Sequence, residues 1–147
     1  MRLLLEADPG RKLFGLDLSE EMLSVARAKL QGRAALTVGD SERLPYPDSV
    51  FDVVYCNDSF HHYPAPEKVL GEVFRVLRPG GTFLLGDCWQ PPVGRAIMNV
   101  YMRHSKTGDV KIYSRKELTA LLAEYFHDVT WERAGLTACI ALGRKGA

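Results

Sequence analysis

Short apolar runs that end in a polar residue alternate with amphipathic segments, and this alternation constrains the fold more than any other feature of the chain. The first three runs are Leu13–Asp17, Ala35–Asp40 and Val50–Asn57. A fourth, Thr82–Asp87, is apolar at successive positions, as expected for a parallel strand that helices cover. Strands that alternate with helices indicate a parallel sheet with helices on both faces, so we predict an α/β fold.

Helix signals lie between and after these runs. Ser19 is the expected N-cap of a helix whose apolar residues recur at helical spacing until Gln31-Gly32 stops it. Ser114 and Glu117 have the spacing of a capping box, which predicts the start of another helix. The expected helices after the third strand are 66–77, 93–104 and 114–124. The double-proline segment 43–48 is expected to be a loop.

The end of the chain has a different pattern. Segments 127–133 and 136–142 read as two strands joined at Ala134-Gly135, which predicts an antiparallel hairpin at the edge of the sheet. The chain has 147 residues, enough to bury one core. We therefore expect residues 1–147 to form a single domain.

Composition excludes some classes of function and location. The formal net charge is +1, which gives no field that would attract nucleic acid, so no nucleic-acid partner is expected. Charged residues interrupt every apolar run, so no membrane span is expected, and the first residues do not form a secretory signal. The three cysteines are far apart in the sequence and are expected to be reduced thiols. A cytoplasmic protein is the resulting expectation.

Four polar residues stand where the predicted strands end, and ligands of open parallel sheets bind at that edge. These residues are Asp17, Asp40, Asn57 and Asp87. A carboxylate such as that of Asp17 accepts two hydrogen bonds from the vicinal hydroxyls of a ribose. Local alternatives remain, in which Asp17 only leads into the helix that Ser19 caps, and Asp40 and Ser41 only form a turn.

A metal site is not expected from the sequence. Cys56, Cys88, His61 and His62 would supply ligands if two strand ends lay side by side, but no closely spaced pair of cysteines supports such a site. Buried thiols are the interpretation that we favour for the cysteines.

Several segments together resemble one enzyme family. In order along the chain these are Gly15–Leu23, Gly39–Pro45, Phe51–Val54, Phe60–Tyr63 and Leu77–Gly81. In sequence and spacing they resemble the class I S-adenosylmethionine-dependent methyltransferases, especially the small-molecule branch that includes ubiquinone and menaquinone biosynthesis enzymes. The resemblance runs from Leu13 to about Gly86, and it implies a Rossmann-like three-layer sandwich.

The resemblance also implies roles for individual residues. The cofactor would be S-adenosylmethionine, with Asp17 on the ribose hydroxyls and Asp40 on the adenine amino group. The other implied cofactor contacts are Leu18 and Met22 on the adenine ring, the backbone amide of Ser41, and Asn57 beside the methionine portion. Leu18 and Met22 have a simpler alternative as core residues. His61 and His62 would face the acceptor, where either is a candidate for catalytic proton transfer.

One departure from the family pattern concerns the start of the chain. The family has a strand and a Gly-x-Gly-x-Gly loop before the ribose-binding acid, whereas sixteen residues precede Asp17 here and none of them forms that motif. Arg2–Ala7 resembles the helix that follows the loop, so the first strand is expected to be missing. The strand ending at Asp17 would then pair with the one ending at Asn57, or another chain would fill the gap in a homodimer.

The sequence thus predicts a methyltransferase that acts on a small-molecule or lipid-like acceptor. The alternative is a catalytically impaired remnant of the fold that serves as a binding or assembly module. A third hypothesis, a nicotinamide-dependent oxidoreductase, is favoured by Asp17 alone and disfavoured by Asp40-Ser41 and by the closing hairpin.

Overall fold

The computed structural model describes residues 1–102 and 108–147, which divide into two compact units, 1–45 and 46–147. Each unit is described by itself. That residues 1–147 form a single domain stays a prediction.

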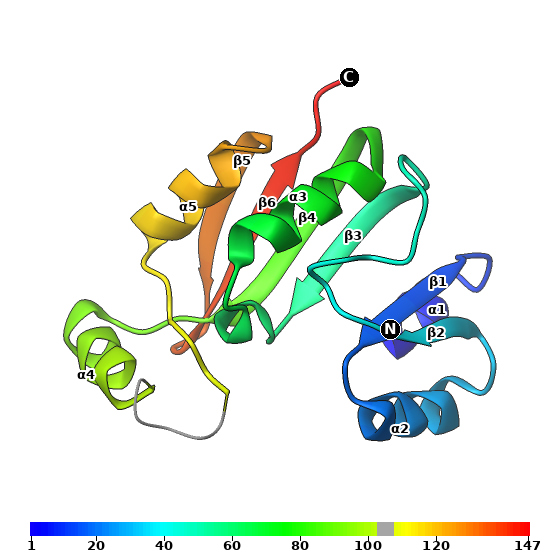
Figure 1. Ribbon diagram of the computed structural model, residues 1–147, viewed down its shortest axis with the longest axis horizontal. Helices are drawn as coiled ribbons and strands as arrows, with labels where there is room; N and C mark the ends of the chain where they lie inside the picture. Colours follow the sequence, from blue (N-terminus) through cyan, green and yellow to red (C-terminus); the bar gives the residue numbers. More distant parts are fainter. Residues whose placement is uncertain (103–107) are drawn as a thin grey trace. The chain divides into compact units, whose positions relative to one another are not determined.

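Unit 1 is a parallel strand pair with two helices (Figure 1). The elements are α1 (Arg2–Ala7), β1 (Leu13–Asp17), α2 (Glu20–Leu30) and β2 (Ala34–Val38). In the parallel register Asp17 lies opposite Val38, so both strands end at the same edge. Three buried leucines form the interior of this unit: Leu5, Leu23 and Leu30.

The ends of α2 follow from its sequence. Ser19 adopts an extended backbone and its hydroxyl accepts a hydrogen bond from the amide of Met22, which is the expected N-cap contact. Gln31 has a φ of 50° and ends the helix in the left-handed region, where Gly32 follows it. Both boundaries confirm the sequence prediction.

Unit 2 is built on a four-stranded sheet in the order β3-β4-β6-β5 (Figure 1). The strands are β3 (Phe51–Asn57), β4 (Leu77–Cys88), β5 (His127–Ala134) and β6 (Ala138–Arg144). β3 and β4 are parallel, and β6 pairs antiparallel with both β4 and β5. The predicted closing hairpin is therefore confirmed, with β5 at the edge.

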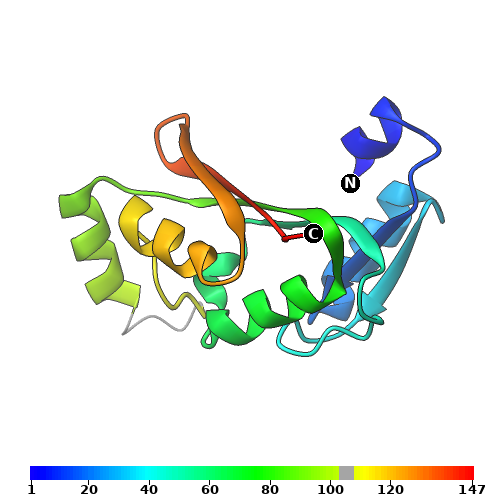
Figure 2. The same cartoon turned by 90° about the horizontal axis from the view of Figure 1, so that it is seen from above.

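Two helices of unit 2 pack on the same face of this sheet (Figures 1 and 2). The helical elements are η1 (Phe60–His62), α3 (Pro66–Val76), α4 (Pro92–Met102) and α5 (Arg115–Ala123). The core joins α3 and α5 to the strands, and its fully buried members include Leu70, Phe83, Leu85 and Leu122. Burial of such side chains stabilises the unit by about 2 kcal/mol each.

Some predicted boundaries were wrong. β4 begins at Leu77, not at Thr82, because Leu77 pairs with Phe51 and the glycine-rich segment bulges before the register resumes at Thr82. β2 ends at Val38, so Asp40 lies in the following turn. The hairpin turn spans residues 135–137. Of the predicted helix 93–104, residues 103 and 104 lie outside the described residues.

The two strands whose pairing was expected beside Asp17 lie in different units. β1 belongs to the two-stranded sheet of unit 1 and β3 to the four-stranded sheet of unit 2. Direct pairing of these strands, or filling of the gap by another chain, stays a prediction. The α/β class, the parallel pairs and the closing antiparallel hairpin are confirmed. No helix in the described ranges combines the length and the apolar composition that a membrane crossing needs.

Candidate functional site

Two carboxylates, those of Asp17 and Asp40, lie at or just after the ends of β1 and β2, and in each of them one oxygen accepts a hydrogen bond from the backbone. The amide of Gly39 donates to the carbonyl of Asp17 at 3.0 Å, which holds the two strand ends together. Oδ1 of Asp17 accepts from the amide of Ser19 at 2.8 Å, and Oδ1 of Asp40 accepts from the amide of Glu42 at 2.9 Å. The second oxygen of each carboxylate has no hydrogen-bond partner in the described part of the chain.

These contacts bear on the local alternatives for both acids. Asp17 leads into α2 and Asp40 forms a turn, as the alternatives state, but each role uses a single carboxylate oxygen. The remaining oxygens have acceptor capacity for a ligand that donates hydrogen bonds. A local and a binding role are thus compatible for both side chains.

Leu18 and Met22 are not core residues, which removes the simpler interpretation of these positions. Their side chains are exposed, with relative accessibilities of 72% for Leu18 and 59% for Met22, whereas the neighbouring Leu23 is buried at 3%. Ser41 is partly buried in the turn after β2. Exposed apolar side chains beside unsatisfied carboxylates suit a nucleoside, which has an apolar ring and polar hydroxyls.

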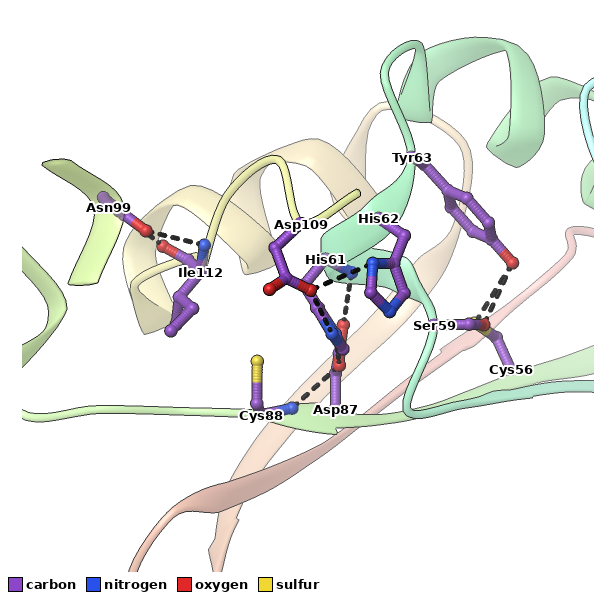
Figure 3. A network of polar contacts seen from close by, with 10 residues as sticks. All are labelled: Cys56, Ser59, His61, His62, Tyr63, Asp87, Cys88, Asn99, Asp109 and Ile112. Carbon is purple, nitrogen blue, oxygen red and sulfur yellow. Dashed lines mark hydrogen bonds and ion pairs between the residues drawn. The ribbon is translucent and has the colours of Figure 1, made fainter. Parts of the chain in front are cut away.

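A buried carboxylate, that of Asp87 near the end of β4, organises the polar contacts of unit 2 around η1, and its side chain is 5% exposed (Figure 3). Its Oδ2 accepts from the amide of His61 at 2.8 Å, and its Oδ1 accepts from the amide of Cys88 at 2.8 Å. The same Oδ1 lies 2.6 Å from Nδ1 of His61. These bonds compensate the buried charge and hold η1 against β4.

The protonation state of His61 follows from these partners. Its hydrogen bond with Asp87 and, to a lesser extent, one with Cys88 raise the pKa of His61 to about 10. At neutral pH the imidazole is therefore protonated on both nitrogens and donates hydrogen bonds. In this arrangement His61 does not serve as a base.

Asp109 lies on the other side of the histidine pair (Figure 3). Its Oδ1 is 3.1 Å from Nδ1 of His62 and 3.6 Å from Nε2 of His61. The amides of Val110 and Lys111 both donate to the carbonyl of His61, at 2.8 and 3.1 Å, and thereby fix the segment that carries Asp109. The imidazole rings have centroids 4.0 Å apart.

Two further hydrogen bonds connect the segment 108–112 to α4. The Asn99 side chain donates to the carbonyl of Ile112 at 3.0 Å and accepts from the amide of Ile112 at 2.8 Å (Figure 3). Ile112 is buried. The segment 108–112 is thus held by η1 at one end and by α4 at the other.

The metal-ligand set considered from the sequence is not brought together in the described residues. The Cys56 thiol instead contacts the hydroxyl of Ser59 at 3.1 Å and that of Tyr63 at 3.7 Å, and burial raises the pKa of this thiol (Figure 3). The clusters with ligand spacing are His61 with Asp87 and Cys88, and His61 with His62 and Asp109.

The sequence also predicted a cofactor contact for Asn57. Asn57 ends β3 in unit 2, where its Oδ1 sits over Gly86. Tyr101 is exposed on α4, and burial raises the pKa of Tyr113 before α5. His104 lies outside the described residues. That the residues of unit 1 and unit 2 share one cleft stays a prediction.

Asp109 is the site residue that sequence reasoning missed. It follows Gly108 in a segment without apolar periodicity, and no local pattern links it to His62, 47 positions earlier. The sequence did give one indication for Asp87 and His61. Asp87 ends a predicted strand, and His61 follows the end of another.

Comparison with known proteins identifies the class to which this fold and these strand-end groups belong. The methyltransferase domain family matches residues 2–85, more than half of the chain. The chain therefore belongs to this family, whose methyl donor is S-adenosylmethionine. The resemblance seen in the sequence is confirmed.

Individual relatives come from several bacteria. A demethylmenaquinone methyltransferase from Thermus thermophilus is 37% identical over 95 residues, which cover 63% of this chain and 43% of that protein. The 27-O-demethylrifamycin SV methyltransferase of Amycolatopsis mediterranei is 35% identical over 117 residues, which cover 75% and 43%. The matches span less than half the length of these relatives.

A solved structure shows the same fold. A SAM-dependent methyltransferase from Thermotoga maritima has a TM-score of 0.74 at 21% identity, covering 90% of this chain and 72% of that one.

Proposed function

We propose that this chain transfers a methyl group from S-adenosylmethionine to a small-molecule or lipid-like acceptor. The observation that carries the proposal is the pair of strand-end carboxylates in unit 1, Asp17 and Asp40, each with one oxygen left for a ligand. Family membership supports a nucleoside cofactor there. Two relatives are named for the methylation of small molecules, demethylmenaquinone and 27-O-demethylrifamycin SV, which supports the acceptor class.

In this proposal Asp17 accepts hydrogen bonds from the ribose hydroxyls and Asp40 accepts one from the adenine amino group. The other cofactor contacts are Leu18 and Met22 on the adenine ring, the amide of Ser41, and Asn57 beside the methionine portion. The bound cofactor supplies an electrophilic methyl group on a sulfonium. The protein then has to align the acceptor and exclude water.

The proposed catalytic residues divide into two roles. His62 is the proton acceptor, because Asp109 lies at its Nδ1 and the side chain is 40% exposed. His61 is the proton donor, because its raised pKa keeps it charged. Asp109 and Asp87 position the two rings.

Calorimetric titration with S-adenosylhomocysteine tests the cofactor site. Asp17→Asn keeps an oxygen for the Ser19 amide but removes the charge, and we expect affinity to fall roughly 10- to 100-fold, since a hydrogen bond to a charged group is worth about 1.5–3 kcal/mol. Glu21→Gln is the matched control, because it removes an exposed charge of α2 and should leave affinity unchanged. Equal affinity in both variants would contradict the ribose assignment.

Formation of S-adenosylhomocysteine from S-adenosylmethionine, measured with and without demethylmenaquinone and 27-O-demethylrifamycin SV as acceptors, tests the reaction. Acceptor-dependent formation is the expected result. Binding of the cofactor without product formation for any acceptor would favour the alternative, a binding or assembly module.

We also propose a homodimer in the cytoplasm that has no nucleic-acid partner. β3 stands at the edge of its sheet in the described chain, and an unpaired edge favours pairing with a second copy. The three cysteines are free thiols, as reducing compartments favour. Light scattering should give the mass of two chains, and a mass of one chain would contradict the dimer. Cell fractionation checks the location.

A further inference from the structure

We propose that His61, His62 and Asp109 form a binding site for a divalent transition-metal cation such as Zn²⁺. The ligand atoms would be Nε2 of His61, Nδ1 of His62 and Oδ1 of Asp109, which all lie within 4.8 Å of one another. The site shares His61 and His62 with the proton transfer described under the proposed function, but methyl transfer itself does not require a metal.

The spacing of the three atoms is the first argument. Two ligands of a tetrahedral zinc ion, each 2.0–2.1 Å from the metal, are about 3.3 Å apart. The carboxylate oxygen of Asp109 lies 3.1 Å from one imidazole nitrogen and 3.6 Å from the other. The longer distance exceeds a normal N–H···O hydrogen bond but suits two ligands of one cation.

The second argument is the way in which His61 is held. Its Nδ1 is engaged by the buried carboxylate of Asp87 at 2.6 Å, and its backbone amide is bound to the same side chain. A metal-ligating histidine commonly donates its other ring N–H to a carboxylate, which fixes the ring and raises the basicity of the ligand nitrogen. Asp87 would therefore orient His61 without contacting the metal, and Nε2 of His61 faces Asp109 (Figure 3).

The third argument is that backbone contacts fix all three ligands in place. His61 and His62 are neighbours in η1, and the amides of Val110 and Lys111 bond to the carbonyl of His61. These two hydrogen bonds hold the segment that carries Asp109 beside the imidazoles.

The donor set indicates the kind of cation. Imidazole nitrogens favour zinc and similar transition metals, whereas Mg²⁺ and Ca²⁺ prefer oxygen ligands. Three protein ligands leave a fourth position open, as in catalytic zinc sites. The side chains of His62 and Asp109 are 40% and 25% exposed, so this position is accessible to water or to an oxygen donor of a small molecule.

A competing set consists of His61, Asp87 and Cys88. It requires Asp87 as a direct ligand, but both oxygens of this carboxylate already accept backbone hydrogen bonds. The set of His61, His62 and Asp109 leaves the hydrogen bonds of Asp87 in place. The thiol of Cys88 therefore distinguishes the two sets in an experiment.

Zn²⁺ titration of the full chain by calorimetry, without an affinity tag, tests the site, and Co²⁺ absorption reports the coordination geometry. Because the metal has to displace the proton on Nε2 of His61, binding should release protons, and the titration is made at about pH 8 to favour this exchange. We expect one Zn²⁺ per chain, and affinity at least about 100-fold lower in His62→Ala and in Asp109→Asn. His127→Ala is the matched control, because this exposed histidine lies outside the cluster. Circular dichroism confirms that each variant is folded.

Two results would overturn the proposal: no binding to the wild type, or equal affinity in Asp109→Asn and His127→Ala. Loss of binding in Cys88→Ser, with Asp109→Asn unaffected, would assign the metal to the competing set instead. Titration with S-adenosylhomocysteine is separate and keeps a failure of this site distinct from a failure of the methyltransferase proposal. A bound cation would also make His62 a ligand in place of a proton acceptor.

Discussion

The acidic side chains at the strand ends differ between the two units in how many hydrogen bonds they accept within the protein. In unit 1, Asp17 and Asp40 each use one oxygen for a neighbouring amide and keep the other available. In unit 2, the Asp87 carboxylate is buried and accepts three hydrogen bonds, two of them from His61. The difference indicates that the carboxylates of unit 1 are free for a ligand and that Asp87 stabilises the structure around it.

The largest expected effect is on stability, from the loss of the buried carboxylate. Asp87→Ala leaves three donors without an acceptor and should lower the free energy of unfolding by about 3 kcal/mol. Asp40→Ala removes an exposed acid of unit 1 and should change it by less than about 0.5 kcal/mol. Urea denaturation of the full chain measures both variants. Similar losses would remove the contrast between the units.

Neighbouring residues of α2 sharpen the comparison within unit 1. Leu23→Ala should cost about 2–3 kcal/mol of stability, because this side chain is buried. Met22→Ala should leave stability within about 0.5 kcal/mol but weaken S-adenosylhomocysteine binding by about fivefold, as expected for the loss of an apolar contact worth about 1 kcal/mol. Thermal unfolding and calorimetric titration give the two values. An unfolding effect of Met22→Ala as large as that of Leu23→Ala would contradict its exposed position.

The helix caps of the two units differ in a smaller way. Ser114 and Glu117 form a reciprocal capping box at α5, whereas the amide of Ser19 at α2 is satisfied by Asp17 instead. Ser114→Ala should therefore cost about 1–2 kcal/mol and Ser19→Ala about 0.5–1 kcal/mol. Parallel denaturant curves test the order. A larger loss of stability in Ser19→Ala than in Ser114→Ala would contradict the expectation that the α5 cap is the stronger one.

The smallest expected effect is a pH dependence at the α5 cap. Hydrogen bonds from Lys111 and Ser114 lower the pKa of Glu117 from 4.5 to about 2. The folded value is below the unfolded one, so the stabilisation is present above about pH 4.5 and is lost as the pH falls through about 2. The wild type should exceed Glu117→Gln by less than about 1 kcal/mol at neutral pH, because the side chain is 45% exposed. Denaturation of both proteins at pH values between about 3 and 7 checks the decline.

Most elements of the fold could be predicted because their signals are local. Ser19 and Gln31 mark the ends of α2, and Ser114 with Glu117 marks the start of α5. The start of β4 could not be predicted, because the segment Leu77–Gly81 reads as a helix stop and a turn. Its first residue joins the sheet through pairing with Phe51, a contact between distant residues.

The residues of the candidate site also differ in whether a local sequence signal marks them. Asp17 and Asp40 could be predicted, because acids at strand ends have a place in the sequence pattern. The role of Asp109 could not, because it depends on two backbone hydrogen bonds that join its segment to His61. Pairing across some 50 residues leaves no periodicity in a single sequence.

The amide of Asn99 has a chemical consequence of its own. It satisfies both the carbonyl and the amide of Ile112, so the position requires a side chain that can donate and accept at once. Deamidation to aspartate would keep the acceptor but set a carboxylate against a carbonyl oxygen. This change in a single residue would replace one of the two hydrogen bonds between α4 and Ile112 with a repulsion, although the size of the side chain would hardly change.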